Sequence, residues 1–362
     1  MDERQVREIE DRSILKALDM QKAAGVQVFT DGEYRRDIFT ADITKAIDGL
    51  VAGKPVIKFE WRGRGKDLAE ESKEGNLQLI VGGKLRKKGR FTPNEAPFLK
   101  RHAPGPFKIC TPAAMQHAIM RYRPGVSDQF YPTLHDMLQD VASIMREEVR
   151  ALIDEGASYV QLDAPSYSNF FDRHRREMLK QSGIDLDQAL DAATAADNAM
   201  IDGIKNGSNV ALGSHFCRGN KRSAWGAEGS YEPIAEKVFG SLTMDRYLLE
   251  FDSERAGGFE PLRFRTQGKT VVLGLVTTTE PALGAADAVA APHRHCITPR
   301  DLQPEYVLIT PEAKVQVRDF GLAEGGAPFR ASGEERRPPV PALTRQGASL
   351  RVLVRPRASR DT

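Results

Sequence analysis

The sequence predicts an α/β fold, because short apolar runs alternate with longer helical patterns through the first 280 residues. The runs are rich in β-branched residues and nearly all apolar, as expected of parallel strands that are buried on both faces. Strands that alternate with helices imply βαβ units and a parallel sheet. The runs occupy residues 26–31, 107–110, 159–163, 210–215, 247–250 and 271–276.

Two of the segments between these runs read as complete helices. Residues 134–155 keep apolar side chains at helical spacing up to Gly156, and residues 186–205 do so up to the vicinity of Gly207. Glycine is common just past the last turn of a helix. Six strands that each end in polar residues favour a (β/α)8 TIM barrel over an open sheet. In that fold the working residues lie at the carboxyl ends of the strands.

Residues 50–103 interrupt this pattern and predict an inserted β-hairpin. Within them, residues 55–61 and 77–84 alternate between apolar and polar side chains, as antiparallel strands do. The basic stretch KLRKKGR over residues 84–90 lies beside the second run. A solvated turn is the favoured interpretation of this stretch, and binding of a phosphate or another polyanion is the alternative.

Both ends of the chain depart from a complete barrel. A helical pattern opens the sequence before any strand, so we expect the first strand to be absent. The composition changes after about residue 280, and nearly half of the 21 prolines lie there. We therefore expect a barrel domain over residues 1–285 and an atypical, poorly ordered tail over residues 286–362. A doubtful last strand would leave sheet edges unpaired, which predicts marginal stability or association with another copy of the chain.

The composition argues against several partners and locations. With 52 basic and 50 acidic side chains, the net charge of +2 gives no electrostatic reason to expect nucleic acid or a membrane surface. No apolar run is long enough to span a membrane, and the charged first residues carry no secretory signal. The three cysteines, Cys110, Cys217 and Cys296, are too few for a disulfide framework and suit a cytoplasmic protein.

A pair of metal-ligating residues ends one of the predicted strands. His215 and Cys217 follow an apolar run, and residues two apart on a strand point to the same side. Glu250 ends the next predicted strand and adds a carboxylate oxygen. Imidazole, thiolate and carboxylate are all ligands of zinc. His215, Cys217 and Glu250 are therefore the candidate zinc ligands, although a lone histidine or buried cysteine more often has a structural role.

Two further carboxylates follow other strand ends. Glu33 lies in the Asp31-Gly-Glu33 turn, and Asp163 closes the run Tyr-Val-Gln-Leu. In a barrel they would face the same mouth as the zinc ligands, where they could hold the ammonium group of an amino-acid substrate. Zinc keeps a bound thiol deprotonated, which makes a strong nucleophile. Taken singly, an aspartate after a strand often caps a helix, and Asp-Gly is a common turn pair.

Five segments together resemble the cobalamin-independent methionine synthase family, in particular its short, single-barrel bacterial members. They are VFTDGEYRRDIF, VQLDAPSY, HFCRGNKRSAWGAEGSYEPIAE, YLLEFDSERAGGFEPLRF and KTVVLGLVTTTEP, and the resemblance covers roughly residues 1–285. It implies a (β/α)8 barrel, a zinc cofactor, and methyl transfer from a methyl-tetrahydrofolate to the thiol of homocysteine. It also implies that His215, Cys217 and Glu250 bind zinc, while Glu33 and Asp163 hold the amino-acid part of homocysteine.

The chain also departs from the family pattern. The last zinc ligand of the family is a cysteine in Ser-Pro-Gln-Cys-Gly, whose nearest counterpart here has Ala313 near that place, and Cys296 lies outside the motif. The tryptophan that stacks on the methyl donor and the proton-donating histidine have no counterparts in residues 111–115 and 274–279. A methylated corrinoid therefore remains an alternative donor. Two alternative functions are alkyl transfer to another thiol, of the coenzyme M type, and a non-catalytic remnant of the family.

Overall fold

The computed structural model describes residues 2–36, 38–40, 43–54, 56–57, 60–62, 78–205, 208–221, 223–275, 277, 279, 307–309, 314–317 and 352–353. The predicted tail over residues 286–362 lies outside this range except for three short strands. Cys296 and Ala313 also lie outside the described residues. The division into a domain and a tail therefore stays a prediction.

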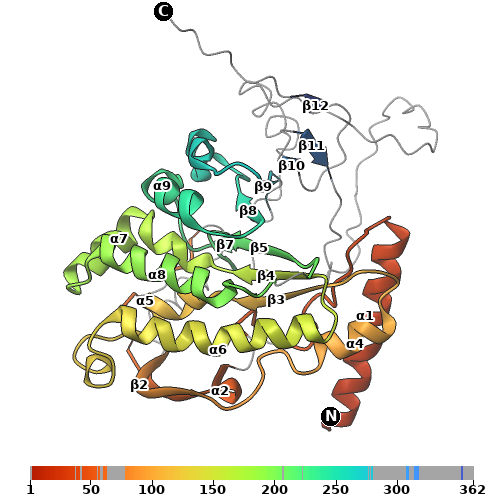
Figure 1. Ribbon diagram of the computed structural model, residues 1–362, viewed down its shortest axis with the longest axis horizontal. Helices are drawn as coiled ribbons and strands as arrows, with labels where there is room; N and C mark the ends of the chain where they lie inside the picture. Colours follow the sequence, from red (N-terminus) through yellow and green to blue (C-terminus); the bar gives the residue numbers. More distant parts are fainter. Residues whose placement is uncertain are drawn as a thin grey trace, which may run out of the picture.

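The centre of the protein is a sheet whose strand order is β12-β11-β10-β9-β8-β5-β4-β3 (Figure 1). The five strands from β3 to β9 in this order are mutually parallel. They are β3 (Lys108–Pro112), β4 (Tyr159–Asp163), β5 (Ala211–Phe216), β8 (Arg246–Glu250) and β9 (Thr270–Gly274). The remaining three are antiparallel, namely β10 (Val307–Ile309), β11 (Lys314–Val317) and β12 (Val352–Leu353).

The parallel sheet confirms the α/β fold that the sequence predicts. Five of the six predicted strands appear within one or two residues of their expected bounds. The sixth, residues 26–31, makes a single parallel bridge from Phe29 to Phe107 at the edge of the sheet beside β3. Closure of the sheet into a complete barrel and the absence of a first strand stay predictions.

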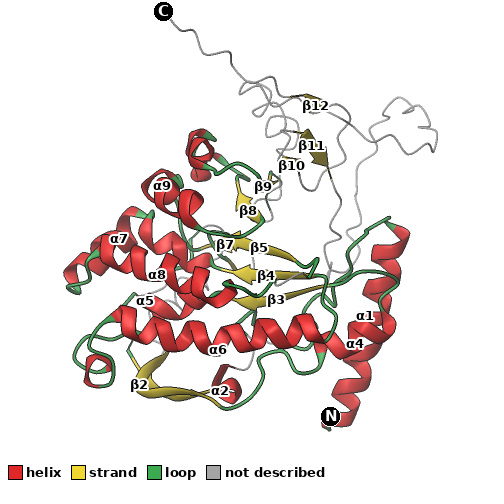
Figure 2. Cartoon of the chain, viewed as in Figure 1, coloured by secondary structure: helices red, strands yellow, loops and turns green. Residues whose placement is uncertain are grey.

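Helices pack beside the parallel strands (Figure 2). The residues at which these helices begin and end carry capping signals in the sequence. In α6, Thr133 and Asp136 form a reciprocal capping box at the first turn, and Gly156 follows the last turn with φ 106°. No helix in the described part of the chain is long and apolar enough to cross a membrane. The helices are α1 (Glu3–Ala23), α2 (Ile43–Ala46), α4 (Glu95–His102), α5 (Ala118–Arg121), α6 (Leu134–Asp154), α7 (Arg173–Gln181), α8 (Leu186–Ile201) and α9 (Glu232–Ser241).

Short 3-10 helices and two short strands complete the loops around the parallel strands. Two of the 3-10 helices follow the carboxyl ends of β3 and β4 directly, so they border the edge where the candidate site residues lie. The 3-10 helices are η1 (Ala114–His117), η2 (Ser127–Gln129), η3 (Pro165–Phe170), η4 (Glu254–Ala256) and η5 (Glu260–Phe264), and the strands are β6 (Asn220–Lys221) and β7 (Ala224–Trp225).

The two faces of the parallel sheet differ in chemistry, because successive residues of a strand point to opposite sides. One set of alternate positions is mainly apolar and buried, and includes Ile109, Val160, Leu162, Leu212, Phe216, Leu249 and Leu273. The other set is mainly polar, and includes Lys108, Cys110, Gln161, Asp163, His215, Arg246 and Glu250. Strand register places Cys110 beside Gln161, and Asp163 beside His215. The polar face therefore gathers most of the predicted site residues.

An antiparallel pair of strands lies apart from the main sheet. β1 (Ile47–Gly53) pairs with β2 (Gln78–Lys87), whereas the sequence placed the first strand at residues 55–61. The glycines of β1 interrupt the alternation of apolar and polar side chains by which a strand is identified in a sequence. At Gly49, with φ 95°, a Cβ would lie 2.5 Å from the carbonyl oxygen of Lys84, so this position requires glycine. That the pair is an insertion into a barrel stays a prediction.

The basic stretch over residues 84–90 lies against the acidic side of α6. The guanidinium of Arg90 binds Glu148 at 2.7 Å and Glu155 at 2.7 Å, and Lys87 binds Glu147 at 2.6 Å. The carboxylate of Glu148 is fully buried and also accepts hydrogen bonds from Thr92. These contacts give the stretch a structural role in attaching β2 and the loop after it to α6.

A buried carboxylate of α8 joins the loops that follow β3 and β4. Asp197 accepts hydrogen bonds from the Met115 amide at 2.9 Å and from the Tyr167 hydroxyl at 3.0 Å. Burial raises the pKa of Asp197 from 3.8 to about 7, against the opposing effect of the two hydrogen bonds. The folded protein therefore binds a proton here more tightly than the unfolded chain does.

This shift predicts a pH-dependent contribution of Asp197 to stability. Between pH ~4 and ~7 the folded state holds the Asp197 proton and the unfolded state releases it, so the stability contribution of this group falls as the pH rises. Urea unfolding of the wild type and of Asp197→Asn, at pH 5 and pH 8, measures the effect. We expect the substitution to cost less free energy of unfolding at pH 8 than at pH 5, and an equal cost at both would contradict the assignment.

Candidate active site at the carboxyl ends of the strands

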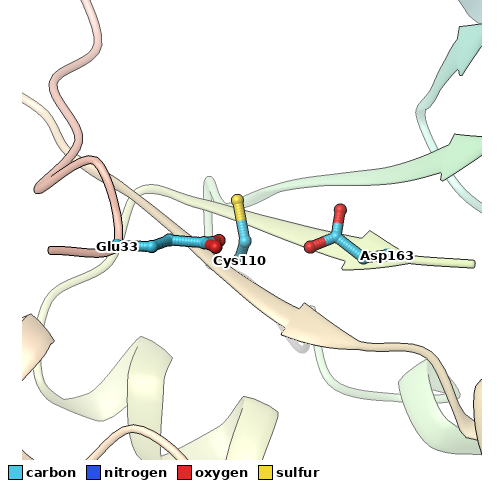
Figure 3. A group of neighbouring side chains, drawn as sticks. All are labelled: Glu33, Cys110 and Asp163. Carbon is cyan, nitrogen blue, oxygen red and sulfur yellow. The ribbon is translucent and has the colours of Figure 1, made fainter. Parts of the chain in front are cut away.

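The Asp31-Gly32-Glu33 turn directs a carboxylate toward the polar face of the sheet. Gly32 and Glu33 have φ values of 68° and 58°, and the left-handed conformation is uncommon for a residue with a side chain. The Asp31 carboxylate holds the turn by accepting a hydrogen bond from the Glu33 amide at 3.1 Å. The Glu33 side chain consequently points toward Cys110 and Asp163, which come from β3 and β4 (Figure 3).

Glu33, Cys110 and Asp163 form a compact group. One ligand atom from each, a carboxylate oxygen or the sulfur, lies within 4.8 Å of the other two. Asp163 is buried, while Glu33 and Cys110 are partly exposed. Burial raises the pKa of Glu33, Arg36 lowers it, and the carboxylates of Asp163 and Asp31 raise it further. The excess of carboxylates over cationic groups favours a bound cation.

Arg36 fixes the position of Glu33. Its guanidinium lies 3.3 Å from a Glu33 oxygen and 2.5 Å from a Glu95 oxygen, and it donates to the Cys110 carbonyl at 2.8 Å. The side chain is only 4% exposed, so these contacts form away from solvent. Arg36 thereby connects the turn, β3 and α4.

A chain of hydrogen bonds crosses three strands and ends on His215. The Lys108 ammonium donates to the Gln161 amide oxygen at 2.9 Å, and the Gln161 amide nitrogen donates to Asp163 at 2.8 Å. The same Asp163 oxygen lies 3.1 Å from Nδ1 of His215. A carboxylate at Nδ1 orients the ring and leaves Nε2 available for another partner.

Cys217 directly follows β5 and Glu250 is the last residue of β8, and the charge of Glu250 acts on the Cys217 thiol. Burial and the Glu250 carboxylate raise the pKa of Cys217 to about 12, so the thiol is protonated at neutral pH. Glu250 accepts hydrogen bonds from the Arg218 amide at 2.6 Å and from the Arg255 guanidinium at 2.9 Å. Burial and Asp252 raise the pKa of Glu250, while Arg218 and Arg255 lower it.

The buried guanidinium of Arg218 holds the loops around this part of the site. The side chain is 1% exposed and lies over the Tyr231 ring, 4.4 Å from its centroid. It donates to the Tyr231 hydroxyl and to three carbonyl groups, those of Gly229, Glu250 and Ala256. Arg218 therefore ties the segment after Cys217 to the end of β8 and to η4.

The structure brings the two predicted substrate-binding carboxylates together and places Asp163 against His215. In the described ranges, Glu33, Cys110 and Asp163 are the group of three whose ligand atoms all lie within 4.8 Å, and His215, Cys217 and Glu250 do not form such a group. The sequence predicts no role for Cys110. Its place at the end of a predicted strand is the same signal that marked Asp163 and Glu250.

The hydrogen-bond partners of the predicted zinc ligands show whether these residues are suited to hold a metal ion. Metal-binding histidines usually give their second nitrogen to a carboxylate, and metal-binding carboxylates are themselves hydrogen-bonded. His215 has Asp163 at Nδ1, and Glu250 has Arg218 and Arg255 on its oxygens. Nitrogen, sulfur and oxygen donors from His215, Cys217 and Glu250 suit zinc. The chemistry of the donor set fits this ion, and their role as ligands stays a prediction.

The fold defines a class of α/β proteins with a parallel sheet, and polar side chains, among them Cys110, Asp163, His215 and Glu250, gather toward the carboxyl ends of its strands. No protein-family model matches the chain. The uncharacterized protein YxjH of Bacillus subtilis is 30% identical over 278 residues, which are 76% of this chain and 70% of that protein. The methionine synthase of Pyrococcus abyssi is 23% identical over 315 residues, which are 87% and 78% of the two chains.

Two solved structures have a fold similar to that of this chain. A B12-independent methionine synthase from Shewanella sp. W3-18-1, in complex with selenomethionine, has a TM-score of 0.59 and 18% identity over 81% of this chain and 79% of that chain. A putative vitamin-B12 independent methionine synthase from Listeria monocytogenes has a TM-score of 0.55 and 25% identity, over 80% and 76%. The chain belongs to the cobalamin-independent methionine synthase family.

Proposed function

We propose that the chain transfers a methyl group to the thiol of homocysteine and forms methionine, with zinc held by His215, Cys217 and Glu250. The family relationship supports the reaction class. The observation that carries the assignment is the place of Asp163, which lies within 4.8 Å of Glu33 and Cys110 and also contacts His215. Asp163 thus joins Glu33 and Cys110 to His215, which is a predicted zinc ligand. An acceptor that carries both an ammonium group and a thiol needs its binding carboxylates close to the zinc.

The side chains have separate tasks in this proposal. Glu33 and Asp163 hold the ammonium group of the acceptor, and Arg36 keeps Glu33 in place. Asp163 also orients the His215 ring. Bound zinc would keep the acceptor sulfur as a thiolate at neutral pH, so that no general base is needed at the sulfur.

Methionine formation is the expected result when the zinc-loaded full chain receives homocysteine and a methyl-tetrahydrofolate. Methylcobalamin in place of the folate tests the corrinoid alternative, and a coenzyme M-type thiol in place of homocysteine tests another acceptor. The methylated thiol is quantified by mass spectrometry. Glu33→Gln should raise the KM for homocysteine, because it removes one charge from the ammonium site, while the exposed control Glu8→Gln should not change it.

Three results would separate the alternatives. Methylation of the coenzyme M-type thiol alone would replace homocysteine as the acceptor. Methylation with methylcobalamin alone would replace the folate as the donor. A zinc-loaded, folded protein that methylates neither thiol with either donor would contradict the proposal and favour the non-catalytic alternative.

A further inference from the structure

Cys110 has no task in the proposed reaction, although it lies between the two carboxylates that would hold the acceptor. We infer that Glu33, Cys110 and Asp163 form a second metal site, which takes a thiophilic divalent cation such as Zn²⁺ or Cd²⁺. We further infer that this cation competes with the ammonium group of an amino acid for the two carboxylates. The competition rests on the proposed function, whereas metal binding by the group does not.

The spacing of the group suits one metal ion. The three ligand atoms lie within 4.8 Å of one another. Zinc binds sulfur at about 2.3 Å and carboxylate oxygen at about 2.0–2.2 Å, so two ligands of a tetrahedral ion lie roughly 3.3–3.8 Å apart. The limit of 4.8 Å includes these separations, so one ion can contact all three ligand atoms without displacing Glu33 from Arg36. Solvent or substrate would supply the remaining ligand.

The surroundings of the group provide an independent argument for a cation. Asp31 and Glu95 are 3% and 4% exposed, and each has one buried carboxylate oxygen without a hydrogen-bond partner. The charge of Asp31 raises the pKa of Glu33, and the charge of Glu33 in turn raises the pKa of Glu95. Buried polar atoms without partners are rare and costly in folded proteins. Arg36 pairs with Glu95 and Glu33, and a further positive charge beside Glu33 would lower the electrostatic cost of these carboxylates.

The thiol distinguishes this site from a simple ammonium site. An ammonium group needs oxygen acceptors, and a cysteine sulfur is a weak one. A thiolate is instead a preferred ligand of zinc and cadmium. On binding, the metal–sulfur bond forms, the S–H bond of Cys110 breaks, and the proton passes to solvent, so the metal binds more weakly as the pH falls. A free amino acid would return the thiol to its protonated state and occupy Glu33 and Asp163.

Cobalt titration of the chelator-treated full chain tests the inference, because thiolate-bound Co²⁺ gives a charge-transfer absorption band. We expect two thiolate-bound equivalents in the wild type, and loss of one equivalent in Cys110→Ser. Cys217→Ala should retain the Cys110 equivalent. In Cys217→Ala, homoserine at ten times its own Kd should weaken the apparent cobalt affinity roughly tenfold, since it carries the ammonium group without a thiol.

The controls separate this inference from the proposed function. The wild type could instead bind a single equivalent of cobalt. If Cys110→Ser loses this equivalent and Cys217→Ala keeps it, the result would support the second site and contradict the proposed zinc ligands. Unchanged stoichiometry and band intensity in a folded Cys110→Ser, as judged by circular dichroism, would overturn the inference. Glu33→Gln, which keeps the thiol, should weaken the same equivalent at least tenfold, and an unchanged affinity would overturn it as well. If homoserine does not change the apparent cobalt affinity, the inferred competition is wrong.

Discussion

Cys217→Ala is expected to remove the zinc that we assign to the end of β5 and to abolish methyl transfer to homocysteine. A substitution among the hydrogen-bond partners of metal ligands typically costs 10- to 100-fold in affinity or activity, so loss of a ligand should cost more than about 100-fold. Zinc content of the purified protein, measured by elemental analysis, and the rate of methionine formation report the two effects. The remaining donors, His215 and Glu250, would bind zinc weakly through nitrogen and oxygen alone.

Ser214→Ala is the matched control for this experiment. Ser214 is fully buried on β5, the strand that precedes Cys217, but it occupies the alternate set of positions, which faces away from His215. We expect its zinc content and activity to match the wild type. Equal zinc content in Cys217→Ala and the wild type, after the Cys110 site is removed by Cys110→Ser in both backgrounds, would contradict the assignment of Cys217 as a ligand.

The sequence allowed the parallel strands and the carboxylate pair to be predicted, because both depend on local patterns. Buried parallel strands read as continuous apolar runs, and their carboxyl ends must meet at one edge of the sheet. This reasoning predicted that Glu33, Asp163 and His215 lie at one edge of the sheet, and the structure places Asp163 close to both of the others. It could not give the distance from His215 to Glu250, since that depends on strand twist and on the arginines around Glu250.

Arg36, Arg218 and β1 show why the rest could not be predicted. Arg36 and Arg218 are almost completely buried, although arginine is usually exposed, and each is compensated by partners far away in the chain. Such pairings follow from tertiary packing and leave no periodic signal. In β1, glycine at position 49 is required by the close backbone of Lys84, so the strand lacks the alternation that would identify it.

Arg218→Ala is expected to have the largest effect on stability among the substitutions considered for this chain. The substitution leaves the Gly229, Glu250 and Ala256 carbonyls without a donor from the guanidinium. Buried polar groups that lose their partners each cost about 1–3 kcal/mol, and loss of a buried charged group costs about 3–5 kcal/mol. We therefore expect the free energy of unfolding, measured by urea denaturation, to fall by roughly 3–5 kcal/mol.

Arg4→Ala provides the control, because the Arg4 side chain is 88% exposed and pairs with the exposed Glu8 on the same helix. It should change the free energy of unfolding by no more than about 0.5 kcal/mol. Arg218→Lys keeps a positive charge but not the fork of donors, so it should recover only part of the loss. A loss below about 1 kcal/mol in Arg218→Ala would mean that water replaces the guanidinium. The loops around Glu250 would then be held by Tyr231 and Arg255, which also contact this end of β8.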